Sequence, residues 1–286
     1  MSNGLRRRRQ RIHLVRAHWG GVLGLLIISM LAAVAIGAPW ISPYDPLYDT
    51  NMVIRYQGPS RAHLFGTDQL GRDILSRVIW GARVSLLVGF ASVAIGGIFG
   101  ATAGLVSGYR GGVFDMTVMR FVDILLSFPF ILLAILLAAF FRPGLLTMIV
   151  AVGVTIAPKF CRISRASTLS ETTCEYVLAA RALGVPDARI CFRHVFPNIL
   201  APLLVTATYQ MATAILTESS LSFLGLGVPP PVATWGTMIE AGRAVLRDAP
   251  WLVLFPGMAI FATVFGFNLL GDGLRDYFDP RLRGVL

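Results

Sequence analysis

The chain has 286 residues, of which 55% are hydrophobic and only 14% charged, and its mean hydropathy is +0.70. A soluble domain carries about 25% charged residues, so this composition excludes an ordinary water-soluble fold and predicts a membrane protein. The formal net charge of +10 does not predict a nucleic-acid partner, because the basic residues recur between apolar runs instead of gathering on one soluble face.

The N-terminal segment, residues 1–19, is rich in arginine and precedes an apolar run at 20–39. Because that run approaches the length a bilayer requires, it predicts a retained first span and not a cleaved signal peptide. Five further apolar stretches predict an all-α polytopic protein with six transmembrane helices. The predicted spans are 20–39, 84–106, 121–141, 145–161, 199–222 and 251–271.

Orientation follows from the distribution of basic residues, which concentrate in cytoplasmic loops. With a cytoplasmic N-terminus, most of the 25 lysine and arginine residues fall inside, so both termini are expected in the cytoplasm. The chain then divides into a basic cytoplasmic N-terminus at 1–19 and a transmembrane domain at 20–286. That domain contains an outer loop at 40–83, a cytoplasmic loop at 162–197 and an outer re-entrant segment at 223–250.

The outer loop predicts an amphipathic helix before the second span. Asp68 is the expected cap, with an apolar face that includes Ile74 and a polar face formed by Arg72, Asp73 and Arg77. This helix is expected to lie along the outer membrane surface.

The cytoplasmic loop predicts a helix from Glu171 to Leu183, with Glu171 and Glu175 in its early turns. Gly184 is expected to end this helix, and Pro186 to open a second short one. The first helix is rich in small and apolar residues. Its periodicity leaves two interpretations open, a partner's groove or the chain's own spans.

The outer segment after the fifth span contains Gly225, Gly227 and three prolines at 229–231, so the chain is expected to turn or re-enter there. Glu218 is predicted near the outer interface. It is either a wetted carboxylate at the end of the span or, with Phe223 and Gly225, a contact at an outer gate or substrate path. Trp235 and Trp251 are interpreted as interfacial anchors or substrate contacts.

The chain has no nucleotide-binding loop, because its single lysine, Lys159, lies in TIAPKFCR without the required glycines. Cys161, Cys174 and Cys191 are too widely spaced for a metal site and are expected to be unpaired thiols, and the four histidines are scattered. The sequence therefore disfavours a membrane-embedded enzyme. An ion-coupled carrier is also disfavoured, since such a carrier would bury several ionisable groups mid-membrane.

Residues 162–197 resemble the loop motif of binding-protein-dependent ABC importer permeases, E-A-A-x-x-x-G followed after nine residues by I-x-L-P. Ala179, Ala180, Gly184 and Pro197 fall in register, whereas Leu178 replaces the glutamate of the motif. The stretches GTDQLGRD (66–73), LSFLGLGVPPP (221–231) and FNLLGDGLRDYFDPRLR (267–283) are similar to the second, shorter permease of the dipeptide, oligopeptide and nickel branch.

The resemblance implies a type I ABC importer permease fold in the bacterial inner membrane. It implies half of a pathway for peptides delivered by an extracytoplasmic binding protein, with nickel or glutathione as alternatives. The implied partners are a second homologous permease and two ABC ATPases, which would bind ATP and Mg; this chain is expected to hold no cofactor. The ATPase-docking residues it implies are Glu175, Tyr176, Ala179, Ala180, Leu183, Gly184 and Pro197.

Overall fold

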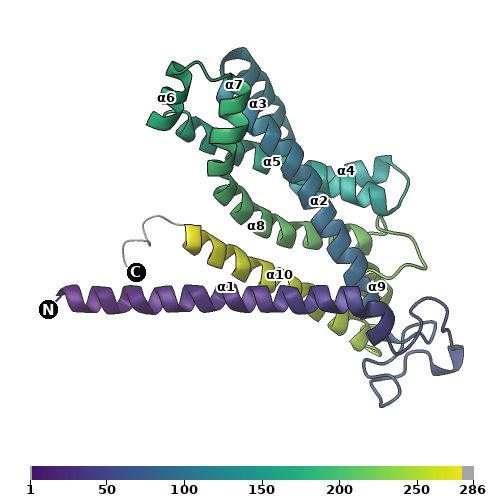
Figure 1. Cartoon of the computed structure of the whole chain (residues 1–286). Helices are drawn as coiled ribbons and strands as arrows, with labels where there is room; N and C mark the ends of the chain where they lie inside the picture. Colours follow the sequence, from purple (N-terminus) through teal and green to yellow (C-terminus); the bar gives the residue numbers. More distant parts are fainter. Residues whose placement is uncertain (1, 279–286) are drawn as a thin grey trace.

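The computed structural model describes residues 2–278, with side chains from residue 19 onward, and this part of the chain is all helical apart from its loops (Figure 1). Five helices are long and apolar enough to cross a membrane, or six candidate spans if one bent pair counts as a single span. The expected all-α membrane fold is therefore confirmed, with one span interrupted. The α-helices are α1 (Ser2–Ile41), α2 (Ile74–Arg110), α3 (Gly112–Ser127), α4 (Phe130–Phe140), α5 (Leu145–Glu171), α6 (Glu175–Ala182), α7 (Asp187–Arg189), α8 (Phe196–Phe223), α9 (Trp235–Arg243) and α10 (Trp251–Phe278).

The bent pair is α3 and α4, which meet at an angle of 92°. Pro129 lies between them, and Phe128 before it has an extended backbone, with φ −79° and ψ 136°. A proline disfavours helical geometry in the preceding residue, so the helix stops there. The prediction of one uninterrupted span at 121–141 is wrong for this reason.

The centre of the bundle is the contact between α2 and α5. Gly96, Gly100, Gly104 and Gly108 recur every fourth residue and form one stripe along α2. A Cβ atom at any of these positions would collide with backbone atoms of α5. Small residues at this spacing allow two membrane helices to approach closely, which explains the tight pairing.

The remaining elements lie around this pair. Helices α1 and α10 run side by side, while α6 and α7 lie at one end of α2, and the 42–73 loop and α9 lie at the other (Figure 1). Helix α2 therefore connects the two ends of the molecule directly.

The amphipathic surface helix predicted from Asp68 does not form. Instead, Asp73 caps α2, accepting a hydrogen bond from the backbone N–H of Ser76, and α2 runs unbroken through the second span. Arg72, Asp73 and Arg77 are buried, because the 42–73 loop folds over the start of α2. Arg72 pairs with Asp68 at 2.8 Å, and Arg77 donates to the carbonyl of Pro46 at 2.9 Å.

The helix predicted from Glu171 to Leu183 is two helices. Helix α5 continues to Glu171, and α6 begins only at Glu175. The hydroxyls of Thr172 and Thr173 donate to the carbonyls of Leu169 and Ser170, which favours a turn between them. The short helix after Pro186 is confirmed as α7, which continues through a π-helix, η2 (Ile190–Val195), into α8.

Candidate docking loop and buried polar cluster

Helix α6 ends in a geometry that requires glycine. The N–H of Gly184 donates to the carbonyl of Arg181, and the N–H of Val185 donates to that of Ala180, which together form a Schellman motif. Gly184 has φ +72°, a left-handed conformation that side chains with a Cβ rarely adopt. The expected helix stop at Gly184 is confirmed.

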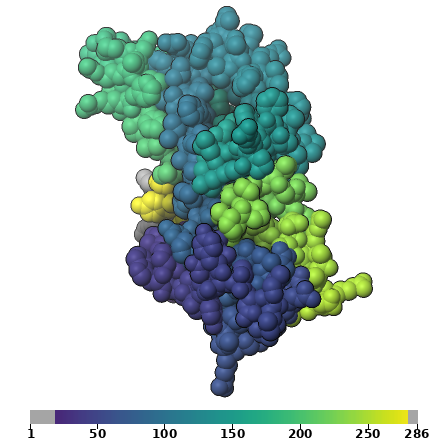
Figure 2. Space-filling model, turned by 90° about the vertical axis from the view of Figure 1, so that its right-hand side faces the viewer, coloured from purple at the N-terminus to yellow at the C-terminus, as the bar shows by residue number. Residues whose placement is uncertain are grey.

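One face of α6 packs on this chain and the other does not. Val177 is fully buried and Ala180 packs against the same core, so the inner face lies on η2. Leu178 and Leu183 are 52% and 83% exposed on the outer side. In Figure 2, this green segment projects from one corner of the molecule. Helix α6 therefore packs on its own chain while leaving an apolar face uncovered.

Tyr176 ties α6 to the two helices that flank the loop. Its hydroxyl contacts Oε2 of Glu171 at the end of α5, and it accepts a hydrogen bond of 3.0 Å from Nδ2 of Asn198 in α8. Partial burial and the hydrogen bond to Glu171 raise the pKa of Tyr176 to about 12. The phenol therefore stays protonated and able to donate at physiological pH.

A second tie joins the loop to α2. The hydroxyl of Tyr109 donates to Oδ1 of Asp187 at 2.6 Å, and the guanidinium of Arg181 lies 5.1 Å from the centre of the Tyr109 ring. A cation over an aromatic face is attracted by the ring's electrons. The loop is thus held to α2, α5 and α8 at three points. No sequence pattern predicted the contribution of Tyr109.

The structure places the expected docking residues on one loop. Glu175, Tyr176, Ala179, Leu183, Gly184 and Pro197 are exposed, and Ala180 is half-buried. Pro197 lies in the first turn of α8, after η2, so it is separated from α6 by the short helices.

Glu218 lies at the opposite end of the bundle and is fully buried, so its interpretation as a wetted carboxylate is wrong. Its oxygens accept hydrogen bonds from Ser85 of α2 at 3.2 Å, and from Ser219 and Ser222 of its own helix at 3.3 and 2.8 Å. These hydroxyls replace the solvation that burial removes. We call these four residues the buried polar cluster.

The other residues expected at an outer gate do not share this environment. Phe223 is half-buried with the Arg243 guanidinium 5.6 Å from its ring centre, and Gly225 is exposed with φ +79°. Trp235 is fully buried and donates to the carbonyl of Val78 at 3.0 Å, so it is not an interfacial anchor.

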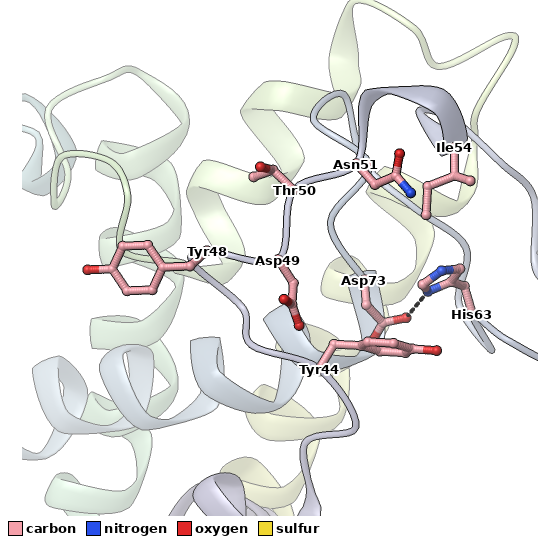
Figure 3. Close-up of a pocket in the computed structure, with 9 residues that line it drawn as sticks. Tyr44, Tyr48, Asp49, Thr50, Asn51, Ile54, His63 and Asp73 are labelled. Atoms are coloured by element: carbon pink, nitrogen blue, oxygen red, sulfur yellow. Dashed lines mark hydrogen bonds and ion pairs between the residues drawn. The ribbon is translucent and has the colours of Figure 1, made fainter.

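The loop before α2 contains a pocket of about 430 Å³ (Figure 3). Asp73 points into its floor, where Oδ1 lies 3.0 Å from Nδ1 of His63, and Oδ2 caps α2. Asp49 accepts from the backbone N–H of Asp45. The contact between His63 and Asp73 therefore holds the loop on the end of α2, and the bond between Asp45 and Asp49 closes a turn within the loop.

Residues 100–284 match the family described as the inner membrane component of binding-protein-dependent transport systems, and residues 11–59 match the N-terminal transmembrane domain of oligopeptide transport permease C. Among curated relatives, the dipeptide transport permease DppC of Alkalihalophilus pseudofirmus is 45% identical over 92% of this chain and 86% of its own length. The oligopeptide permease OppC of Bacillus subtilis is 45% identical over 92% of this chain and 86% of its own. The glutathione permease GsiD of Pectobacterium atrosepticum is 42% identical over 94% and 89%.

Among solved structures, a chain of the MetNI methionine ABC transporter, in an inward-facing form, matches the fold with a TM-score of 0.60 and 21% identity. The match covers 74% of this chain and 98% of that one. The fold is therefore that of an ABC importer permease, a multi-pass transport subunit of the inner membrane and not an ATPase. The chain belongs to the binding-protein-dependent transport permease family and is of the OppC and DppC type, which confirms the resemblance inferred from the sequence.

Proposed function

We propose that this chain forms half of the translocation pathway of an ATP-driven peptide importer. The curated relatives carry the proposal, because dipeptide and oligopeptide permeases match more than nine-tenths of the chain at 45% identity. The glutathione permease relative supports glutathione as an alternative, and glutathione is itself a small peptide. The other half of the pathway is a second, homologous permease subunit.

The motor is a pair of ABC ATPases that bind ATP and Mg and dock on α6. The uncovered apolar face at Leu178 and Leu183 supports this assignment, because exposed apolar side chains that lie outside the bundle gain stability from a partner's groove. Ala179 has a small side chain that allows a partner to approach closely, and Gly184 ends the helix at the edge of the same surface. Closing of the ATPases pushes α6. The side-chain contacts of Tyr176 and Tyr109 then transmit the movement to α2, α5 and α8.

The orientation that fits this assignment places α6 and both termini in the cytoplasm. The basic residues of the N-terminal segment favour it, since positive charge is retained on that side. The 42–73 loop and α9 then face outward, where a loaded binding protein lands on them. Glu218 lies beneath α9 in this arrangement and holds the outer end of the bundle together.

Co-purification and uptake test the proposal together. The permease pair, the ATPases and the binding protein are reconstituted in liposomes, and uptake of a labelled dipeptide is measured with and without ATP. We expect uptake that requires both ATP and the binding protein. Uptake driven by an ion gradient without the ATPase subunits would instead identify a secondary carrier.

The docking surface is tested separately with Leu183→Asp, which places a charge at the centre of the proposed contact. We expect the ATPases to be lost during purification while the two permeases stay together. Thr173→Asp is the matched control, because Thr173 is exposed in the turn before α6 and lies off its apolar face. Retention of the ATPases by Leu183→Asp would place docking elsewhere.

A further inference from the structure

A pocket of about 430 Å³ lies between α3, α5 and α8, away from the docking loop and the buried polar cluster. Its size falls in the range of small-molecule binding sites. The lining residues are Leu126, Lys159, Arg162, Ile163, Thr206, Tyr209 and Gln210. None of them was assigned a role in transport by the sequence.

Lys159, the only lysine of the chain, lies near the middle of α5. Two arginines follow it at intervals of one turn, and each has a carboxylate on α3. Arg162 donates to Asp123 at 2.6 Å, and Arg165 pairs with Asp115 at 2.5 Å. Lys159 has no such partner among the described residues; its ammonium lies 5.8 Å from the ring centre of Phe130.

An ammonium within a predicted span is costly unless something pairs with it, and such groups commonly mark a transport path. The ring of Phe130 attracts the positive charge but accepts no conventional hydrogen bond. Lys159 therefore keeps donors available for a ligand in the pocket.

Gln210, from the middle of α8, lines the same pocket and is only 4% exposed. Its Nε2 has no hydrogen-bond partner among the described residues. A buried amide donor without a partner loses free energy that a ligand acceptor would restore. Lys159 and Gln210 thus place donors without partners on two facing helices, and because the Gln210 amide is shielded by its neighbours, its side chain must rotate to reach a ligand.

The lining contains no carboxylate, and the two carboxylates bonded to lining residues are engaged. Asp123 pairs with Arg162, and Asp272 accepts a 2.6 Å hydrogen bond from the hydroxyl of Tyr209. Apart from Arg162, which is held by Asp123, the available groups are therefore one cation and one amide donor, and these favour an anion that accepts hydrogen bonds.

We propose that Lys159 and Gln210 form a subsite in the translocation pathway that binds the C-terminal carboxylate of the transported peptide. A carboxylate supplies the negative charge for the ammonium and a second oxygen for the amide. The proposal rests on the proposed function, since it names a contact for that substrate. The pocket is open on one side, where the second permease subunit would complete the wall around the rest of the peptide.

The test is a double-mutant cycle between the protein and the substrate. Initial uptake of a dipeptide and of its C-terminal amide is measured in liposomes containing the complete importer, with the binding protein saturated by either peptide. The variants are Lys159→Met, which removes the charge at nearly constant length, and Lys159→Arg, which retains it. ATP hydrolysis stimulated by the loaded binding protein reports assembly and docking.

We expect Lys159→Met to lower uptake of the free acid about tenfold or more, as for loss of a charge-assisted hydrogen bond, and to leave uptake of the amide within about twofold of wild type. Lys159→Arg retains uptake of the acid. Equal losses for the acid and the amide, or no loss for either, would overturn the subsite.

Gln210→Glu is a second variant that keeps the shape of the side chain and places a carboxylate beside the pocket. It pairs with Lys159 and repels the substrate, so we expect acid uptake to fall while stimulated ATP hydrolysis persists. Unchanged acid uptake would contradict the proposal. If the wild-type importer transports neither peptide with ATP, the peptide-importer function itself fails, and this outcome is distinct from failure of the subsite.

Discussion

The hydroxyl of Tyr109, in the last turn of α2, donates a 2.6 Å hydrogen bond to Oδ1 of Asp187, the first residue of α7. Because α2 extends from this bond to the 42–73 loop, the bond lies on a direct mechanical connection between the two ends of the molecule (Figure 1). The Arg181 guanidinium lies over the same ring, so α6 is held there as well.

Tyr109→Phe removes this hydrogen bond and retains the ring under Arg181. We expect the number of peptides transported per ATP hydrolysed to fall about two- to tenfold, since a solvent-exposed hydrogen bond of this kind contributes about 0.5–1.5 kcal/mol. Uptake and ATP hydrolysis measured on the same liposomes give this ratio. Tyr277→Phe is the control, because Tyr277 is 66% exposed and its hydroxyl has no bond among the described residues. An unchanged ratio for Tyr109→Phe would show that this hydrogen bond does not contribute to coupling between ATP hydrolysis and transport.

Gly184→Val forces a β-branched residue into a left-handed conformation. The left-handed backbone is expected to raise the free energy of the end of α6 by about 1–2 kcal/mol. The added side chain meets no other atoms, because the space around Gly184 is open. We expect normal membrane insertion but uncoupled transport. Gly257→Ala tests the specificity, since Gly257 lies in α10 with similar open space and no left-handed φ. Full ATP-dependent uptake by Gly184→Val would show that this helix end does not affect coupling.

Glu218→Leu removes the acceptor of three hydroxyls in the buried polar cluster. Buried donors left unpaired cost about 1–3 kcal/mol, so thermal unfolding of the detergent-solubilised complex should begin at a lower temperature. Glu218→Gln keeps one oxygen and adds a donor that the serine hydroxyls can accept, so its destabilisation should be smaller. Equal melting temperatures for wild type and Glu218→Leu would contradict the structural importance of the cluster.

The pKa of Tyr176 is raised from 10.0 to about 12, by partial burial first and then by its hydrogen bond to Glu171. The neutral phenol is thus the favoured form in the folded protein. Its contribution to stability is complete below pH 10 and is lost as the pH rises through about 12. In absorbance titrations, wild type and Tyr176→Phe should release the same number of phenolic protons up to pH 11. One additional tyrosine titrating near pH 10 in wild type would contradict the shift.

Gly104→Val tests the glycine stripe of α2. An added side chain collides with the backbone of α5. We therefore expect the folded permease to lose at least about 1–3 kcal/mol of stability and to be less abundant in the membrane. Gly97→Ala is the matched control on the same helix, because its Cβ would meet only the Phe160 ring at an ordinary distance of 3.5 Å. Similar amounts of folded protein for both variants would argue against close packing as the function of the stripe.

Several elements followed from local chemistry and were predictable. The apolar runs predicted the spans, Gly184 predicted the end of α6, and Pro186 predicted the start of α7. Each of these features depends on neighbouring residues in the chain or on the transfer of apolar side chains from water into lipid. Both can be judged from the sequence alone. The same reasoning failed at Phe128, where the apolar run continued but Pro129 ended the helix.

Composition, missing nucleotide-binding residues and motif spacing are linear properties, so they were enough to predict the membrane as the solvent, the class of protein and the loop proposed here to dock a partner. The tertiary structure alone decided how distant residues meet. It buried Glu218 among the hydroxyls of two helices, joined Tyr109 to Asp187 across the docking loop, and left Lys159 and Gln210 unpaired in one pocket. These contacts depend on how helices pack against one another, and helix packing is set by side chains that lie far apart in the chain.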